Sequence, residues 1–511
     1  MSPGVTRRLA VVDLGSNSFR LVVFSAEGGW WKRTDEIYEP VRIGAGLGLS
    51  GSLAAEPMAR ALRTIDVFAH FCRASGLSAQ CVDVVATSAI RDAENGDQFL
   101  EHARQRAGLP VRVLSREEEA RYGYLAAVNS TTLADGCALD LGGGSLQLVR
   151  VDGRLARETG SWALGAVRMT ERFLAGPGPA KRRQLEDLRG FARKQLRSAA
   201  WLGGSGRRLV GIGGTVRNLA AAAQRTQGRP STGVQGEIMS AEVLDELVHR
   251  LSALAPQDRG EVSGIKPGRA DVILAGAAVL QTVLAVGGFD GLEATEAGLR
   301  EGIFFERHLA AEDPPLFEDV RRASVLNLAG QYHVDAAHTE HVAHLALGLF
   351  DQLADQGLHA GDRIERELLW AACVLHDIGM TVDYDDHHKH SRYLILNAGL
   401  PGYAPAEVAV IAQAARYHRK GLPDPGPLAA LFGEVERARL ARCAALLRLA
   451  EDLERSRDQG VRQVDAVVSD GQVELRLTAD GEAAVPRWAA AREEQLFARA
   501  FNRRLRVMAG R

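Results

Sequence analysis

The sequence predicts an α/β protein with two lobes facing a central cleft, followed by a helical domain and a small α+β module. Two observations lead to this prediction. The register D-L-G-x-x-S-x-x-L occurs twice, in "VDLGSNSFRLVVF" and "LDLGGGSLQLV", and each copy reads as strand, tight turn and strand. From about residue 315, alternating strand and helix patterns give way to almost purely helical ones.

The elements follow in order along four predicted regions. Residues 1–132 form the first lobe, with the first hairpin, strands in "VDVVATSAI" and "VRVLS", and helices in "DQFLEHARQRAG" and "REEEARYGYLAAV". Residues 133–310 form the second lobe, which opens on the second hairpin and continues with the strand-turn "LVGIGGTVRNLA". Residues 315–458 form the helical domain. Residues 459–511 form an α+β module that begins with a hairpin.

Composition excludes several classes of partner. The net charge of −2 gives no general reason to expect binding to nucleic acid or to a membrane surface. Five cysteines without a C-x-x-C spacing fit a reducing compartment, and the sequence predicts a cytoplasmic protein. The most apolar segment, "DVILAGAAVLQTVLAVGGF", is interrupted by polar residues and ends in glycines, so we expect a buried helix.

The two repeated turns are candidate phosphate loops. Consecutive glycines let backbone N–H groups point into one space, where they bind phosphate oxygens. One copy alone is typical of a plain β-hairpin, but duplication at matched register favours two facing binding loops. The candidate phosphate contacts are Ser16, Asn17 and Ser18 in the first turn and Gly142, Gly143, Gly144 and Ser145 in the second. Asp13 and Asp140 stand at the two turn entrances, where a carboxylate can hold a divalent cation.

Two further stretches are candidates to complete a phosphate cleft. Gly213, Gly214 and Thr215 lead from a strand into a helix, whose N-terminus favours anions. Arg91 follows the strand in "ATSAIRDAEN", where a guanidinium can fork two phosphate oxygens. Each stretch taken singly is more typical of plain structure.

The acidic run at the start of "REEEARYGYLAAV" contains a candidate general base. Ser115 and Glu118 match a capping box, which gives Glu118 a structural role. Glu119 is turned about 100° around the helix from Glu118 and is free to act on water.

These residues resemble the exopolyphosphatase and guanosine pentaphosphate phosphohydrolase (Ppx/GppA) family, within the actin-like and sugar-kinase-like ATPase superfamily. The matching stretches run in order from about residue 8 to 305: "VDLGSNSFRLVV", "ATSAIRDAEN", "SREEEARYGYLAA", "LDLGGGSLQLV", "LGAVRMTERFL", "GIGGTVRNLA", "RADVILAGAAVL" and "ATEAGLREGIF". The resemblance implies two actin-like lobes and removal of the terminal phosphate from polyphosphate or from guanosine pentaphosphate (pppGpp). It also implies Mg²⁺ or Mn²⁺ in the cleft and a homodimer.

Carried over by position, the resemblance implies that Glu119 is the catalytic base and that Asp140 orients water or metal. It implies that Arg91 clamps the phosphate chain. One position departs from the family pattern, because Gln147 stands where the family usually has a glutamate that resembles a metal ligand. Strand alternation places Gln147 on the same face as Ser145, toward the cleft, so we count it as a candidate metal residue.

The region from residue 315 resembles the HD-type helical domain of the family's long members. The adjacent pair His376-Asp377 ends an apolar helix, and ten of the 14 histidines fall between positions 333 and 418. The resemblance implies a second divalent metal site for which imidazole and carboxylate ligands suit Mn, Fe or Zn. Its candidate ligands are His338, His376, Asp377, His390, His418 and Glu451. A helical domain that only shapes the channel and the dimer is the alternative.

The sequence leaves four functions open. The first is an exopolyphosphatase with Glu119 as general base, and the second is a pppGpp phosphatase with the same chemistry. The third is a non-catalytic binder of polyphosphate or guanosine phosphates, which Gln147 motivates. The fourth is a kinase-like ATPase, which the position of Glu119 disfavours.

Overall fold

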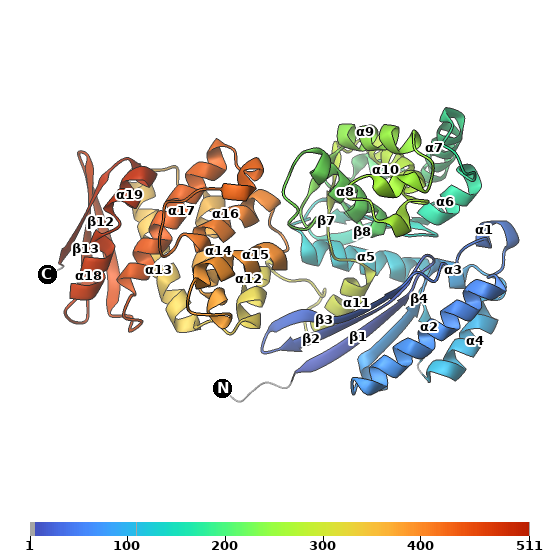
Figure 1. Cartoon of the computed structure of the whole chain (residues 1–511), viewed down its shortest axis with the longest axis horizontal. Coiled ribbons are helices and arrows are strands. Elements are labelled where there is room, and N and C mark those ends of the chain that lie inside the picture. The colour runs from blue at the N-terminus through green and yellow to red at the C-terminus, as the bar shows by residue number, and fades with distance from the viewer. Residues whose placement is uncertain (1–5, 109, 510–511) are drawn as a thin grey trace. The chain divides into compact units, whose positions relative to one another are not determined.

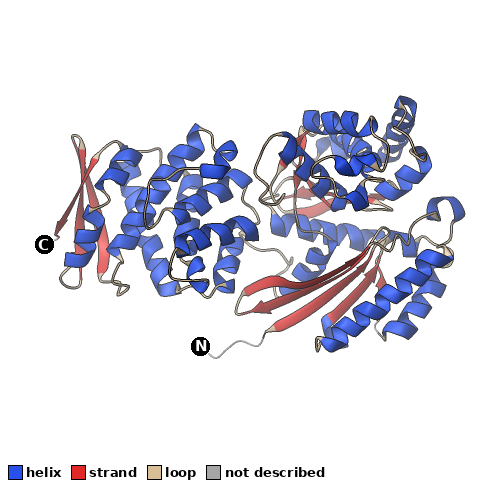
Figure 2. Ribbon diagram, viewed as in Figure 1, coloured by secondary structure: helices blue, strands red, loops and turns tan. Residues whose placement is uncertain are grey.

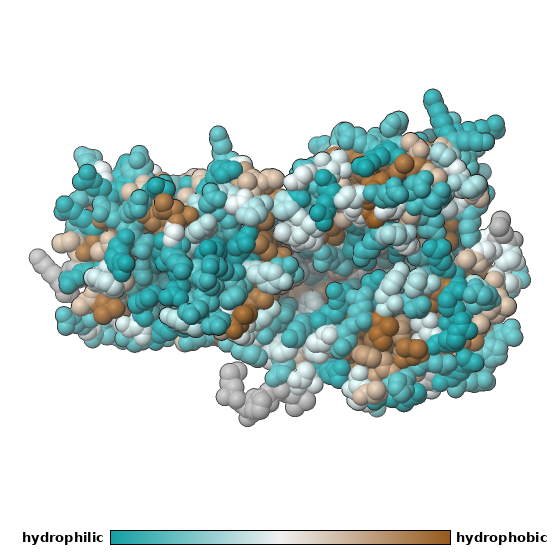
Figure 3. Space-filling view, viewed as in Figure 1, coloured by the Kyte–Doolittle hydropathy of each residue, from teal (hydrophilic) through white to brown (hydrophobic). Residues whose placement is uncertain are grey.

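The computed structural model describes residues 6–108 and 110–509, and these fold into two units, residues 1–320 and 321–511. Figures 1 and 2 show mixed sheets with flanking helices in the first unit and a mainly helical second unit. On the face drawn in Figure 3, hydrophilic residues predominate and apolar ones lie in small separate patches. No helix within the described ranges is long and apolar enough to cross a membrane.

The first lobe is built on a five-stranded sheet with the order β3-β2-β1-β4-β5. Strands β1 and β2 form the predicted hairpin, and β4 and β5 run parallel to β1. Its strands are β1 (Arg7–Leu14), β2 (Phe19–Glu27), β3 (Trp30–Glu39), β4 (Val82–Ala86) and β5 (Val111–Val113). Its helices are α1 (Leu47–Ser50), α2 (Ala55–Ala74), α3 (Ser88–Arg91), α4 (Gly96–Ala107) and α5 (Arg116–Ser130).

The second lobe repeats this topology in a six-stranded sheet with the order β10-β11-β9-β6-β7-β8. Strands β6 and β7 form the second hairpin, and β9 runs parallel to β6 as β4 does to β1. Its strands are β6 (Gly136–Leu141), β7 (Leu146–Asp152), β8 (Leu155–Trp162), β9 (Leu209–Ile212), β10 (Ile238–Ser240) and β11 (Gly291–Ala294). Its helices are α6 (Ala166–Phe173), α7 (Arg182–Leu196), α8 (Gly214–Thr226), α9 (Ala241–Ser252), α10 (Ile273–Gly287) and α11 (Leu299–His308).

Helices α5 and α11 lie between the two sheets (Figure 1). They share one apolar cluster with residues from both lobes, such as Val11 of β1 and Val210 of β9. The predicted apolar helix at residue 271 onward is α10, whose residues are almost all buried in the core of the second lobe. The two-lobed α/β fold predicted from the repeated register is therefore confirmed, and α5 starts at the seam between the lobes.

The second unit packs its helices and a three-stranded sheet around one apolar cluster. The cluster takes in residues from Val325 to Leu505, so the three strands and the last two helices share a core with the helices before them. The helices are α12 (Val320–Gln331), α13 (Ala336–Asp355), α14 (Arg363–Leu375), α15 (His387–Ala398), α16 (Pro405–Arg416), α17 (Glu434–Leu453), α18 (Ala484–Ala491) and α19 (Glu494–Phe501). The strands are β12 (Val461–Ser469), β13 (Gln472–Ala479) and β14 (Arg504–Ala509).

Candidate active site

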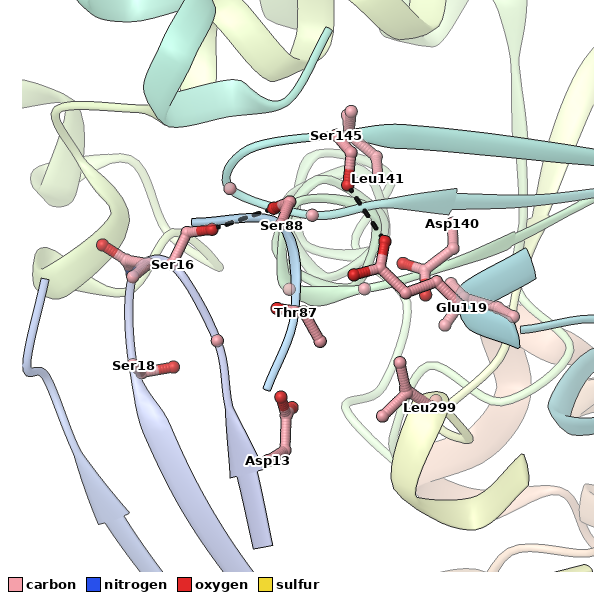
Figure 4. Close-up of a pocket in the computed structure, with 18 of the residues that line it drawn as sticks. Asp13, Ser16, Ser18, Thr87, Ser88, Glu119, Asp140, Leu141, Ser145 and Leu299 are labelled. Atoms are coloured by element: carbon pink, nitrogen blue, oxygen red, sulfur yellow. Dashed lines mark hydrogen bonds between the residues drawn. The ribbon is translucent and has the colours of Figure 1, made fainter. Parts of the chain in front are cut away.

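The two glycine turns meet at one cavity of about 140 Å³ in the first unit. The hydroxyl groups of Ser16 and Ser88 are hydrogen-bonded at 3.1 Å on the first lobe (Figure 4). Gly144 of the second lobe lies so close to them that a Cβ there would be 2.4 Å from the Ser88 hydroxyl. Only a residue without a side chain permits this approach, so the second turn can face the first across a narrow gap.

Most of the predicted phosphate and metal residues line this cavity. They are Asp13, Ser16, Asn17, Ser18, Glu119, Asp140, Gly142, Gly143, Ser145, Gln147, Gly213 and Gly214. Three predicted contacts lie elsewhere. Gly144 lines a small adjoining cavity, and Thr215 is fully buried at the start of α8. Arg91 donates to the carbonyl oxygen of Leu114 and to Glu119, so it contacts the candidate base, where the sequence predicts a clamp on the phosphate chain.

Glu119 lies in the first turn of α5 with its carboxylate toward the second loop (Figure 4). The predicted capping box is present, because Ser115 accepts from the Glu118 amide and Glu118 accepts from the Ser115 amide. Glu119 itself is only 4% exposed. The fold thus separates the capping carboxylate from the one that faces the cavity.

Both oxygens of Glu119 accept hydrogen bonds. Oε1 lies 3.0 Å from Nη1 of Arg91, and Oε2 lies 2.7 Å from Nε2 of Gln147. The Ser145 hydroxyl donates to Oε2 at 3.4 Å. Burial raises the pKa of Glu119 to about 7, against the lowering effect of Arg91 and with a smaller rise from Asp140. A carboxyl with a pKa near neutrality suits general base catalysis.

Asp13 and Asp140 are the last residues but one of β1 and β6, and they point into the same space (Figure 4). Burial raises the pKa of both carboxyls, that of Asp140 to about 6, where Arg217 opposes the rise and the charge of Asp13 adds to it. Two buried carboxylates that disfavour each other's ionisation supply the hard oxygen ligands that Mg²⁺ or Mn²⁺ prefers. These two residues fit the predicted metal.

Four arginines also line the cavity, and sequence reasoning missed them. They are Arg20, Arg217, Arg269 and Arg300. The sequence contained a signal for Arg20. Arg20 stands two residues after Ser18, as Gln147 stands two residues after Ser145, so strand alternation places both on the cleft face. The other three come from separate segments that are adjacent only in the folded chain.

These arginines are held close to the loops. Nη1 of Arg300 lies 3.4 Å from Oδ2 of Asp13. Arg269 packs on Gly214, where a Cβ would lie 2.4 Å from its guanidinium. Burial and the charge of Arg300 lower the pKa of Arg217 to about 10, which leaves the group charged at neutral pH. Guanidinium groups around amide-rich loops are suited to a chain of phosphates.

The second unit holds a buried cluster of imidazoles and carboxylates. Oδ1 of Asp377 lies 3.2 Å from Nε2 of His387 and 3.6 Å from Nε2 of both His376 and His418. Oε2 of Glu451 lies 3.0 Å from Nε2 of His338 and 3.3 Å from Nε2 of His376. Asp377 therefore belongs to two possible ligand groups, one with His338 and His376 and one with His387 and His418.

His387 stands in this cluster where the sequence predicted His390. Ser391, four residues after His387, bonds to the carbonyl oxygen of His376, so the inward face of α15 is the one through residues 387 and 391. His390 is turned about 60° from His387 and is partly exposed. The prediction of His390 is corrected for this reason.

The tautomers of the cluster suit a metal. Nδ1 of His376, His387 and His418 lies 2.7–2.8 Å from the carbonyl oxygens of Cys373, Tyr384 and Ala415. A carbonyl only accepts, so each Nδ1 carries a proton, and Nε2 presents a lone pair whenever the ring is neutral. Burial and the charge of His376 lower the pKa of His418 to about 3, whereas Asp377 and Glu451 outweigh burial and raise the pKa of His376 to about 9.

A cavity of about 370 Å³ adjoins this cluster. Asp377, His338 and Arg457 are among its lining residues. Nη2 of Arg457 lies 2.6 Å from Oδ2 of Asp377, so a guanidinium already contacts the central carboxylate.

Comparison with known proteins matches both units of the chain to one family. The profile of the Ppx/GppA phosphatase family matches residues 22–311, and that of Ppx/GppA phosphatase domain III matches residues 320–486. The solved Ppx/GppA family member from Aquifex aeolicus is 27% identical, covers 60% of this chain and 99% of its own, and has a TM-score of 0.52. An exopolyphosphatase-like protein is 27% identical over 58% of this chain and 96% of its own, with a TM-score of 0.53. An exopolyphosphatase from Cytophaga hutchinsonii, 20% identical over 59% of this chain and 97% of its own, shares the fold with a TM-score of 0.55.

Proposed function

The chain belongs to the Ppx/GppA phosphatase family, and on that premise we propose that it is an exopolyphosphatase that hydrolyses the terminal phosphate of linear polyphosphate. The observation that carries the proposal is the setting of Glu119. Its carboxyl, with a pKa of about 7, faces a cavity lined by two glycine loops and four arginines. This combines a base for water with a cradle for several phosphates.

The reaction follows from these groups. Glu119 accepts a proton from water while the water oxygen forms a bond to the terminal phosphorus. The bond to the bridging oxygen breaks, and orthophosphate leaves the shortened chain, which keeps the bridging oxygen. Arginines and loop amides stabilise the charge that develops on the phosphoryl oxygens. Asp13 and Asp140 would hold Mg²⁺ or Mn²⁺, which when bound neutralises phosphate charge.

The lining supports polyphosphate over a nucleotide. Its apolar members among the described residues are Leu141, Ile212 and Leu299, and none offers an aromatic face for a base. One observation favours pppGpp as the second candidate. The exposed ring of Tyr38 packs 4.8 Å from the guanidinium carbon of Arg20, itself a lining residue, and a guanine base can stack on such a ring.

A side-by-side assay tests the proposal. Purified protein with Mg²⁺ or Mn²⁺ is expected to release orthophosphate from long-chain polyphosphate faster than from pppGpp or ATP. Faster release from pppGpp would favour the second candidate, and faster release from ATP would favour the ATPase. Binding of polyphosphate without release under any divalent metal would favour a non-catalytic binder. The homodimer and the cytoplasmic location remain predictions.

We also propose that the second unit binds one or two divalent transition ions. Nε2 of His387 and Nε2 of His418 lie 3.1 Å apart, and both carry lone pairs because both Nδ1 atoms face carbonyl oxygens. Two lone pairs at this distance repel each other unless a proton or a metal ion lies between or beside them, and Asp377 completes a possible ligand set for a metal ion. Buried Nε2 of His376 and Oδ1 of Asp377 also lack hydrogen-bond partners.

Elemental analysis of the full-length protein tests this second proposal. His376→Ala is expected to lower the bound Mn, Fe or Zn, whereas His390→Ala is the matched control and is expected to retain it. Equal metal content in the wild type and His376→Ala would contradict the proposal. Loss of metal in His390→Ala would return that residue to the ligand set.

A further inference from the structure

Gln147 turns its amide nitrogen, an atom that cannot ligate a metal, toward the candidate base. It lies on β7 opposite Asp140 and is 4% exposed. Its Nε2 donates to Oε2 of Glu119 at 2.7 Å and to the hydroxyl oxygen of Ser145 at 2.9 Å. The Ser161 hydroxyl lies 3.4 Å away. An amide nitrogen only donates, so the atom that Gln147 turns toward the base has no lone pair for a cation.

The second oxygen of Glu119 is held from another residue. Arg91 donates to Oε1 at 3.0 Å and is fixed in turn by the carbonyl oxygen of Leu114 at 2.8 Å. The carboxylate is therefore gripped at both oxygens. Each carboxylate oxygen has two acceptor sites. The Ser145 hydroxyl takes the second site of Oε2, so Oε1 keeps the one that can face water.

Whether residue 147 is an amide or a carboxylate decides how the carboxylate of Glu119 is held in place. A carboxylate in the same place would oppose Glu119 with a second negative charge in a buried site, and a cation between them would be required to hold both ionised. The amide of Gln147 holds Glu119 with a hydrogen bond and adds no charge.

We infer that Gln147 is the positioning residue for Glu119, and that a cation bound at Asp13 and Asp140 takes no ligand from residue 147. The inference rests on the proposed function for the catalytic part of this role. In this role Gln147 fixes the orientation of the Glu119 carboxylate, so that the oxygen that accepts the proton stays in place during the reaction.

The test compares the wild type with Gln147→Leu, Gln147→Glu and the matched control Gln105→Glu. Gln105 donates to Glu101 at 2.8 Å on the exposed surface of α4, so this control makes the same change in a similar pair outside the cleft. The measurements are kcat and KM for long-chain polyphosphate, the pH–rate profile, and Mg²⁺ binding by calorimetry without substrate.

Gln147→Leu is expected to lower kcat by about 10-fold to 100-fold with little change in KM, because the base loses its orientation. The acidic limb of the pH–rate profile of this variant is expected to move to higher pH. The Mg²⁺ affinity of the variant is expected to equal that of the wild type. Gln147→Glu is expected to bind Mg²⁺ about 10-fold more tightly, because it adds a carboxylate beside two others. Gln105→Glu is expected to match the wild type in every measurement.

Two results would overturn the inference. Weaker Mg²⁺ binding by Gln147→Leu would make Gln147 a metal ligand, and an unchanged kcat and pH profile in that variant would remove its role in positioning. Failure of the proposed function is seen separately, as a wild type that releases no phosphate from polyphosphate. Calorimetry of Mg²⁺ binding needs no turnover, so it still tests the metal part of the inference if the wild type is inactive.

Discussion

Glu119→Gln is expected to abolish phosphate release and, at alkaline pH, to stabilise the first unit. The substitution keeps the size and the hydrogen-bonding shape of the side chain. Its carbonyl oxygen can accept from Arg91, and the amide of Gln147 can turn over to accept from the new NH₂ group. What the variant lacks is a proton acceptor, and a general base is worth about 10² to 10⁴ in rate.

The stability change follows from the pKa of the buried carboxyl. Burial raises this pKa from 4.5 to about 7, and at about 1.4 kcal/mol per pKa unit the ionised group costs the folded state about 3 kcal/mol. The wild type is free of this cost below pH 4.5, where both folded and unfolded carboxyls are protonated. It acquires the cost as the pH rises to 7. Glu119→Gln never ionises and avoids the cost throughout.

Two measurements on the same protein check this reasoning. Orthophosphate release is followed with long-chain polyphosphate, and thermal unfolding is followed at pH 5 and pH 8.5. We expect Glu119→Gln to raise Tm by several degrees at pH 8.5 and by much less at pH 5. The matched control is Glu118→Gln, because glutamine also serves in a capping box, and it is expected to keep wild-type activity. Turnover by Glu119→Gln within tenfold of the wild type, or an equal gain in Tm at both pH values, would refute the argument.

Three other perturbations probe the remaining features. Arg91→Leu should move the acidic limb of the pH–rate profile upward by about one unit, because Arg91 lowers the pKa of Glu119; an unmoved limb would show that this arginine does not act on the base. Gly214→Ala should raise KM for polyphosphate about tenfold by displacing the flexible Arg269 guanidinium, with little change in Tm; an unchanged KM would exclude Arg269 from binding. Chelation of the full-length protein should lower the Tm of residues 321–511, an effect that Asp377→Asn should remove, and identical melting with and without chelator would count against a metal there.

Features set by neighbouring residues were predictable from the sequence. The two hairpins follow from strand alternation around glycine turns, and the structure places them at β1-β2 and β6-β7 as predicted. Glu119 could be separated from Glu118 because a capping box acts over three residues. Side chains alternate between the two faces of a strand every two residues, so Gln147 was expected to share a face with Ser145.

Features set by distant residues were not predictable in this way. Arg217 lies in α8, Arg300 lies in α11 and Arg269 precedes α10, and only the folded chain brings these three segments to one cavity. The sequence predicted His390 as a ligand, but His387 lies three residues away, and only the inward face of α15 distinguishes the two.

The sequence by itself determined the two-lobed α/β fold, the paired loops and the carboxylate that faces them, because periodicity, turn composition and helix capping are local. The tertiary structure decided what surrounds that carboxylate. Packing of α5 between the sheets brings Glu119 within hydrogen-bonding distance of Arg91 on one lobe and Gln147 on the other. Burial at that seam raises the pKa of Glu119 to about 7. Desolvation depends on every residue that covers a group, so it appears only when the whole chain is folded.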